Sequence, residues 1–102
     1  MKIVTVCAQG NNRSVQFASL LRYKYNADTI AVGVDKHTPE TLEMLYAWSD
    51  IIIVTDKNLA GKIPEKYRSK MKIWDVGPDI YPRPFNPILN HIARKIIEEN
   101  PL

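Results

Sequence analysis

The sequence has only one cysteine, Cys7, among its 102 residues. A single thiol cannot form an internal disulfide, so the fold needs no oxidising compartment and any thiol chemistry must proceed without a second cysteine of the chain. The sequence also lacks an apolar run of the length that a membrane span or a secretory signal requires. We therefore expect a cytoplasmic protein without membrane contact.

Repeats, low-complexity tracts and linkers are absent as well, so we expect one domain over residues 1–102. Hydrophobic residues make up 45% and charged residues 25% of the chain, which is typical of a globular protein and excludes a disordered one. The formal net charge of +3 is a mild bias toward anionic partners. We interpret one basic run as a solvated face rather than a nucleic-acid site, which would need a series of aromatic platforms. This run consists of Lys66, Arg68, Lys70 and Lys72.

Histidines are few and isolated. His37 falls in a predicted loop and His91 on the polar side of the last predicted helix, and no cluster has the spacing of metal ligands. We interpret both as surface residues and expect neither a metal nor another cofactor.

Short apolar runs alternate with helical patterns along the chain. Strands are predicted at 2–6, 29–34, 50–56 and 71–76, and helices at 14–25, 39–48, 57–61 and 87–99. Such alternation implies right-handed crossovers and a parallel sheet. We predict a three-layer α/β domain, in which a four-stranded parallel sheet carries helices on both faces. Ligands of such sheets lie beyond the carboxyl ends of the strands.

The cysteine opens a polar loop between the first predicted strand and the first predicted helix. In this loop, "CAQGNNRS" (the Cys7 loop, residues 7–14), Arg13 follows Cys7 by six positions and Ser14 comes next. A loop that leads into a helix N-terminus directs backbone N–H groups and the positive end of the helix dipole at one point, which favours an anion. The planar guanidinium of Arg13 would hold two phosphate oxygens at once.

The same donors would stabilise the thiolate of Cys7, which makes it a nucleophile. Ser14 could donate its hydroxyl to that thiolate when sulfur leaves a phosphocysteine intermediate. The alternative is a small buried cysteine that happens to precede a surface arginine. The place of the loop between strand and helix favours the first interpretation.

The Cys7 loop resembles the Cys-x5-Arg-Ser/Thr signature of cysteine-dependent phosphatases, and its place after the first strand is similar to that in the low-molecular-weight protein tyrosine phosphatase superfamily. Its signature is also similar to that of the RNA polymerase II C-terminal-domain phosphatase. The segments "AWSDIIIVTDK" and "DVGPDIYPRPFNPIL" resemble short bacterial predicted tyrosine phosphatases, so the resemblance spans nearly the whole chain.

This resemblance implies a metal-free reaction through a cysteinyl phosphate, with an aspartic acid from a late loop as proton donor. It also implies that phosphate binds Ala8, Gln9, Gly10, Asn11, Asn12, Arg13 and Ser14. Two features depart from the family. Gly10 stands where the family usually has an asparagine that braces the loop, so Asn11 or Asn12 would take over that role. The chain is also shorter than the typical member, which reduces the walls of the substrate cleft.

A leaving alkoxide or phenoxide needs a proton, so a carboxylic acid should lie over the loop. Asp79 in "PDIY" resembles the acid loop of the family, and Tyr81 could flank an aromatic leaving group. Asp75, at the end of the fourth predicted strand, is the second candidate, although it could instead accept backbone N–H bonds at the turn. We favour Asp79.

The sequence thus favours a protein tyrosine phosphatase of low molecular weight that acts on a phosphorylated protein or a small phosphomonoester. Phosphate, vanadate, arsenate or sulfate would occupy the Cys7 loop. Two alternatives stay open. An arsenate reductase would need an external thiol such as glutathione, because the chain has no second cysteine. A module that binds phosphorylated ligands with little or no turnover is favoured by Gly10 and the short cleft.

Overall fold

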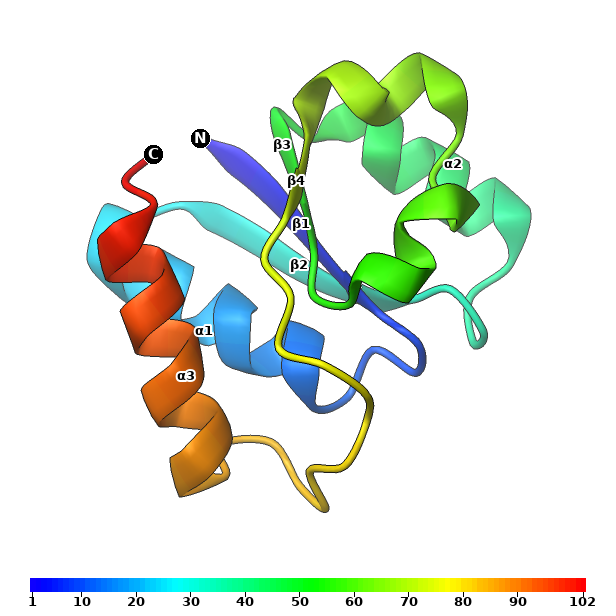
Figure 1. Ribbon diagram of the computed structural model, residues 1–102. Helices are drawn as coiled ribbons and strands as arrows, with labels where there is room; N and C mark the ends of the chain where they lie inside the picture. Colours follow the sequence, from blue (N-terminus) through cyan, green and yellow to red (C-terminus); the bar gives the residue numbers. More distant parts are fainter.

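Strands and helices alternate along the chain as the sequence predicts. The computed structural model describes all residues, 1–102, and Figure 1 shows their course. The elements in chain order are β1 (Lys2–Cys7), α1 (Arg13–Tyr25), β2 (Asp28–Gly33), α2 (Pro39–Trp48), β3 (Ile51–Val54), the 3-10 helices η1 (Lys57–Lys62) and η2 (Glu65–Lys70), β4 (Met71–Ile73) and α3 (Pro87–Glu99).

All four strands are parallel, and their order in the sheet is β2-β1-β3-β4. The chain runs from β1 through α1 to β2 on one side of β1, and through α2 to β3 on the other. The strand order therefore reverses at β1, and ligands of open parallel sheets bind beyond the strand ends at such a point. Cys7 is the last residue of β1 and pairs with Gly33, the last residue of β2.

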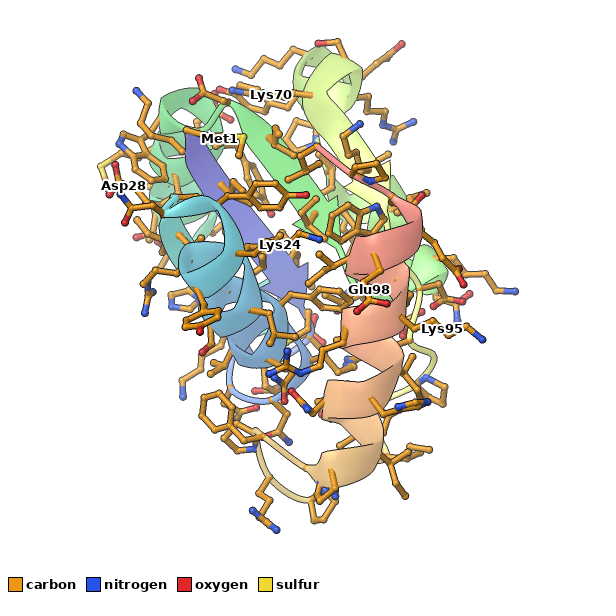
Figure 2. The ribbon with its side chains drawn as sticks, turned by 90° about the vertical axis from the view of Figure 1, so that its left-hand side faces the viewer. Met1, Lys24, Asp28, Lys70, Lys95 and Glu98 are labelled. Carbon is orange, nitrogen blue, oxygen red and sulfur yellow. The ribbon has the colours of Figure 1, made fainter.

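Helices cover both faces of the sheet, which confirms the predicted three-layer α/β fold. On one face α1 and α3 stand side by side, as Figure 2 shows. Side chains of β1 alternate between the two faces, since Ile3 packs with α1 and α3 whereas Val4 and Val6 pack with α2 and η1. The first core comprises Ile3, Phe17, Leu20, Leu21, Ala27, Ile53, Trp74, Val76, Tyr81, Leu89, Ala93 and Ile97. The second comprises Val4, Val6, Val32, Tyr46, Ile52, Val54, Leu59 and Ile63.

Two helices begin with a capping side chain that is followed by a proline. The side chain of Thr38 accepts a hydrogen bond from the N–H of Thr41 and Pro39 follows it, so α2 begins as predicted. Asn86 accepts from two N–H groups of the first turn of α3, and Pro87 opens that helix. These caps fix the two loops that precede α2 and α3 at the carboxyl edge of the sheet.

Two elements differ from the prediction. Strand β4 has only residues Met71–Ile73, although the N–H groups of Trp74 and Val76 still donate to the carbonyls of Val54 and Thr55. The helix η2 was not predicted, because it buries no side chain and so lacks an apolar stripe in the sequence.

Three side chains of the basic run have partners within the chain. Lys66 pairs with Glu43, Lys70 donates to the carbonyl of Ser49, and Arg68 donates to the carbonyl of Ile63. Lys72 is the member for which no hydrogen bond or ion pair is formed. The run therefore lies at the surface, and three of its side chains contact neighbouring segments there.

None of the helices has the length and apolar character that crossing a membrane demands.

Tyr46, in the second core, has a buried polar atom without a partner. Its side chain is 2% exposed, and its hydroxyl forms no hydrogen bond. Burial raises the pKa of Tyr46 from 10.0 to about 12, because the phenolate is poorly solvated among apolar side chains. Folding thus removes this hydroxyl from water without replacing its hydrogen bonds.

We expect Tyr46→Phe to raise the free energy of unfolding by about 1 kcal/mol near neutral pH, because it removes an unpaired buried hydroxyl. The advantage should grow as pH rises from about 10 toward 12, since the unfolded chain ionises its tyrosine first and the native protein loses stability there. Urea denaturation near pH 7 and near pH 11 measures both effects. Tyr23→Phe is the matched control, because Tyr23 is 89% exposed. A fall in stability for Tyr46→Phe would show that the hydroxyl is hydrogen-bonded.

Candidate active site

The thiol of Cys7 lies at the base of the loop that it opens. Cys7 is 2% exposed, and the N–H of Gly10 donates to its Sγ at 3.1 Å. A second hydrogen bond joins Cys7 Sγ to Ser14 Oγ at 3.1 Å. Thr5 donates from Oγ1 to the carbonyl of Ser14 at 2.7 Å, so the start of α1 is attached to β1. The sequence-predicted pair of Cys7 and Ser14 is therefore in direct contact.

The N-terminus of α1 leaves its first N–H groups available for an anion. Asn12 occupies the N-cap position, yet its side chain makes no capping hydrogen bond, and the first turn has no acidic residue. The first N–H of the helix to find a backbone acceptor is that of Gln16, which donates to Asn12 at 3.0 Å. Unpaired N–H groups and the helix dipole make such an end a site for anions.

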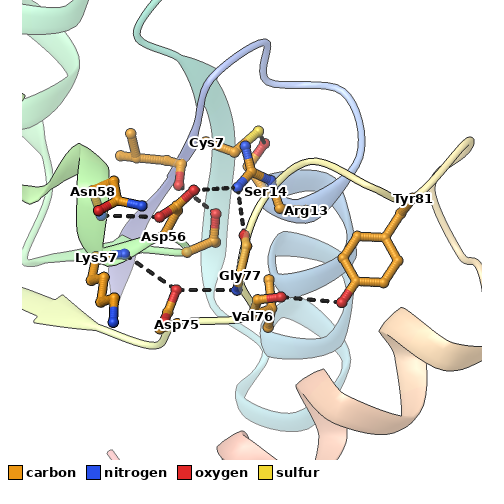
Figure 3. Close-up of polar contacts among 12 residues, drawn as sticks. Cys7, Arg13, Ser14, Asp56, Lys57, Asn58, Asp75, Val76, Gly77 and Tyr81 are labelled. Carbon is orange, nitrogen blue, oxygen red and sulfur yellow. Dashed lines mark hydrogen bonds and ion pairs between the residues drawn. The ribbon is translucent and has the colours of Figure 1, made fainter.

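Arg13 is buried with one edge of its guanidinium bound and the other free. The residue is 2% exposed, and its Nη1 donates to Asp56 Oδ2 at 2.9 Å and to the carbonyl of Gly77 at 2.8 Å (Figure 3). Its Nε is buried without a partner, and Nη2 forms no hydrogen bond. The free edge, Nε and Nη2, is the fork that binds two oxygens of a phosphate or carboxylate.

Asp56 holds Arg13 in this orientation, a role that the sequence did not reveal. Its Oδ2 accepts from Arg13, while its Oδ1 accepts from the N–H of Asn58 at 2.9 Å and caps η1. The signal that could have revealed the contact with Arg13 was the position of Asp56, because this residue follows β3, the strand beside β1, at the same edge of the sheet.

Gly10 and Gly33 let the Cys7 loop contact the end of β2 backbone to backbone. Gly10 has φ of 75°, and a Cβ on it would lie 2.7 Å from the nitrogen of Gly33. A Cβ on Gly33 would lie 2.3 Å from the carbonyl carbon of Gln9. Neither position can hold a side chain without displacing the backbone of the other segment. This explains why residue 10 is glycine rather than the asparagine that is usual in the family that the sequence resembles.

The expectation that Asn11 or Asn12 braces the Cys7 loop in place of that asparagine is wrong. Asn11 is exposed and forms no hydrogen bond, and the Nδ2 of Asn12 donates outside the loop, to the carbonyl of Tyr81 at 2.7 Å. The contact between Gly10 and Gly33 positions the loop instead. Ala8 and Gln9 lie in the same loop, and the N–H of Asp35 donates to the carbonyl of Ala8 at 2.8 Å.

The two candidate acids have different surroundings. Asp75 accepts from the N–H groups of Lys57 and Gly77 at 3.2 and 3.1 Å, so it stabilises the turn that opens the late loop (residues 76–86). Asp79 is exposed, its carboxylate has no hydrogen bond or ion pair, and it is the central residue of a turn closed by the N–H of Ile80 and the carbonyl of Pro78 at 2.9 Å. Of the two candidates, Asp79 is therefore the one whose carboxylate has no partner in the chain.

Tyr81 does not lie where the sequence interpretation expected it. Its side chain is 7% exposed and packs in the core beside α3, and its hydroxyl donates to the carbonyl of Val76 at 3.1 Å. Burying the ring while its hydroxyl finds a backbone acceptor satisfies both parts of the side chain. The exposed apolar residues of the late loop are Ile80 and Phe85.

His37 is half-buried rather than a plain surface residue. Its Nδ1 lies 3.0 Å from the backbone nitrogen of Gly33, which donates to it, so the imidazole supports the turn after β2. His91 is exposed on α3. No group of three or more His, Cys, Asp or Glu side chains is arranged to hold a metal ion.

We expect Gly33→Ala to destabilise the protein by about 1–3 kcal/mol and to abolish binding of inorganic phosphate, because the added methyl must displace the backbone of Gln9 and Gly10. Urea denaturation and calorimetric titration with phosphate measure the two effects. Gly61→Ala is the matched control, since a Cβ there meets nothing within 4 Å. Unchanged phosphate binding in Gly33→Ala would show that the contact does not shape the loop.

Solved structures share this fold over nearly the whole chain, although the sequence matches no family model and no curated protein. Wzb of Vibrio vulnificus in complex with benzylphosphonate has a TM-score of 0.66 at 20% identity, and the alignment covers 96% of this chain and 92% of that one. A low-molecular-weight protein tyrosine phosphatase from Bacillus subtilis has a TM-score of 0.59 at 19% identity, with 98% and 99% covered.

A third similar structure is a cysteine-to-serine mutant of the arginine phosphatase YwlE with a phosphorylated active-site serine. Its TM-score is 0.60 at 20% identity, and the alignment covers 96% of this chain and 90% of that one. All three alignments cover nearly the whole of both chains. The chain therefore has the fold of the low-molecular-weight protein tyrosine phosphatases.

Proposed function

We propose that the protein is a cysteine-dependent phosphomonoester hydrolase, a tyrosine phosphatase of the low-molecular-weight type. The observation that carries this proposal is the free edge of the buried Arg13 guanidinium, whose Nε has no partner. An unpaired buried N–H is costly, and an oxyanion would supply the missing acceptor. The unpaired N–H groups at the start of α1 and the thiol of Cys7 belong to the same loop.

The proposed reaction has two steps. In the first, Cys7 Sγ attacks phosphorus, the S–P bond forms, and the P–O bond to the leaving group breaks as Asp79 gives that oxygen its proton. In the second, the Asp79 carboxylate takes a proton from water, the water oxygen bonds to phosphorus, and the S–P bond breaks. Ser14 stabilises the departing thiolate through the contact at 3.1 Å.

Arg13 and the helix N-terminus supply the electrostatic part of catalysis. Charge on the equatorial oxygens of the transferred phosphoryl group would be met by the fork of Arg13 and by the N–H groups of the loop. Asp56 keeps the fork in place before substrate arrives, so no reorganisation is needed during the reaction. Proposed substrates are phosphorylated proteins or small phosphomonoesters, and the related oxyanions would occupy the loop as inhibitors.

Two similar structures bear on the choice of substrate and mechanism. Wzb holds benzylphosphonate, and the YwlE mutant carries a phosphorylated active-site serine. Both support a substrate that carries a phosphoryl group. The contact between Gly10 and Gly33 also weakens one of the two arguments for a module without turnover, because the backbone of Gly33 supports the loop where the family has an asparagine. The short cleft is the other argument.

We expect the protein to hydrolyse para-nitrophenyl phosphate and Cys7→Ser to reduce the rate at least about a thousandfold, because an alcohol is a far weaker nucleophile than a thiolate. Release of nitrophenol measures the rate, and binding of inorganic phosphate by Cys7→Ser serves as the folding control. Hydrolysis that survives in Cys7→Ser would contradict the proposal. Activity toward arsenate with glutathione but none toward aryl phosphates would favour the arsenate reductase.

We expect Asp79→Asn to slow hydrolysis of phenyl phosphate by on the order of a hundredfold and that of para-nitrophenyl phosphate much less, because a good leaving group departs without a proton. Steady-state rates for the two substrates measure the difference. Asp75→Asn is the matched comparison, and it should lower thermal stability while leaving the ratio of the two rates unchanged. The opposite pattern would make Asp75 the acid.

A further inference from the structure

The side chain of Asn12 is used in an unexpected way. Asparagine is among the best N-cap residues, since its side-chain oxygen can accept from the free N–H groups of the first helical turn. At the N-cap of α1 it makes no such bond, and its Nδ2 instead donates at 2.7 Å to the carbonyl of Tyr81, 69 residues away. This arrangement leaves the N–H groups of the first turn of α1 without a capping acceptor, and it connects the Cys7 loop to the late loop.

The next residue, Arg13, makes a second tie to the late loop. Its Nη1 donates to the carbonyl of Gly77 at 2.8 Å. Two consecutive residues of the Cys7 loop thus hold the carbonyls of Gly77 and Tyr81, which flank Asp79 by two positions on either side. Between them, the bond from Ile80 to Pro78 makes Asp79 the central residue of a tight turn.

Few other contacts fix the position of this turn, although the N–H of Gly77 also donates to Asp75 at 3.1 Å. No helix or strand is present between Ile73 and Pro87, and Pro78, Asp79 and Ile80 are all exposed. Tyr81 anchors one end of the turn in the core, but its hydroxyl bonds to Val76 within the same loop. The hydrogen bonds from Asn12 and Arg13 are therefore the polar contacts that place the turn relative to the Cys7 loop.

We propose that Asn12 is a positioning residue that sets the reach of the Asp79 carboxyl over the phosphoryl group, a role that rests on the proposed function. Proton transfer requires donor and acceptor within about 2.6–3.2 Å, and a displacement of about 1 Å costs up to about a hundredfold in rate. Arg13 both binds the anion and holds the late loop, whereas the side chain of Asn12 only holds the late loop. Removing the side chain of Asn12 therefore tests the position of the late loop without removing a group that binds the anion.

The test compares leaving groups in Asn12→Ala. We expect phenyl phosphate hydrolysis to fall about tenfold or more, para-nitrophenyl phosphate hydrolysis to fall no more than about threefold, and inhibition by inorganic phosphate to stay within about twofold. The ratio of the two rates does not depend on the folded fraction, because both substrates meet the same preparation. In the Asp79→Asn background, Asn12→Ala should leave that ratio unchanged, since the acid is already absent.

Asn90→Ala is the matched control. Asn90 Oδ1 accepts from Gln16 Nε2 at 3.1 Å, so this substitution also removes an amide hydrogen bond between α1 and the segment after the late loop. Unlike that of Asn12, the side chain of Asn90 makes no hydrogen bond to the late loop, so the ratio of the two rates should equal that of the unsubstituted protein.

The outcomes separate the two proposals. An equal loss of rate on both substrates in Asn12→Ala would overturn the role of Asn12. So would a change of the rate ratio in Asn90→Ala that is as large as in Asn12→Ala. In both cases the proposed hydrolase function would be unaffected. No hydrolysis of either substrate by the unsubstituted protein would overturn the proposed function and this role together.

Discussion

The buried ion pair between Arg13 and Asp56 is the contact on which the arrangement of the candidate site depends. It joins the start of α1 to the segment after β3, and through the same nitrogen Arg13 also holds the carbonyl of Gly77 after β4. Removing one partner of a buried pair costs about 3–5 kcal/mol, because the remaining charge stays uncompensated. The pair therefore fixes three loops at one edge of the sheet and also aims the free fork of the guanidinium.

Much of the fold follows from patterns that are local in the sequence. The strand and helix ranges, including the helix starts at Pro39 and Pro87, and the parallel sheet came from periodicity and from residues next to one another. Cys7, Arg13 and Ser14 were identified in the same way, because a short loop brings them together by sequence spacing alone. Element ends were less exact, and η2 had no apolar stripe to mark it.

The parts of the site that the sequence did not reveal depend on contacts between distant segments. Asp56 meets Arg13 across 43 residues, and Asn12 meets Tyr81 across 69. Tyr81 was assigned to the substrate cleft because Asp79, two positions before it, was. The chain turns at Asp79, however, and leaves Asp79 exposed while Tyr81 is buried in the core. The spacing of residues in the sequence does not predict whether a polar side chain, such as that of Asn11 or Asn12, bonds within its own loop or to a distant one.

The contact between Gly10 and Gly33 also links the Cys7 loop to the register of the sheet. Gly33 lies opposite Cys7 at the end of the β1–β2 pairing, where it has no side chain. A shift of β2 by one residue would bring Val32 or Val34 to that place, and their side chains would push the Cys7 loop out of shape. A chain that misaligns this strand pair thus cannot build the proposed anion site, so binding of phosphate there would report correct sheet assembly during folding.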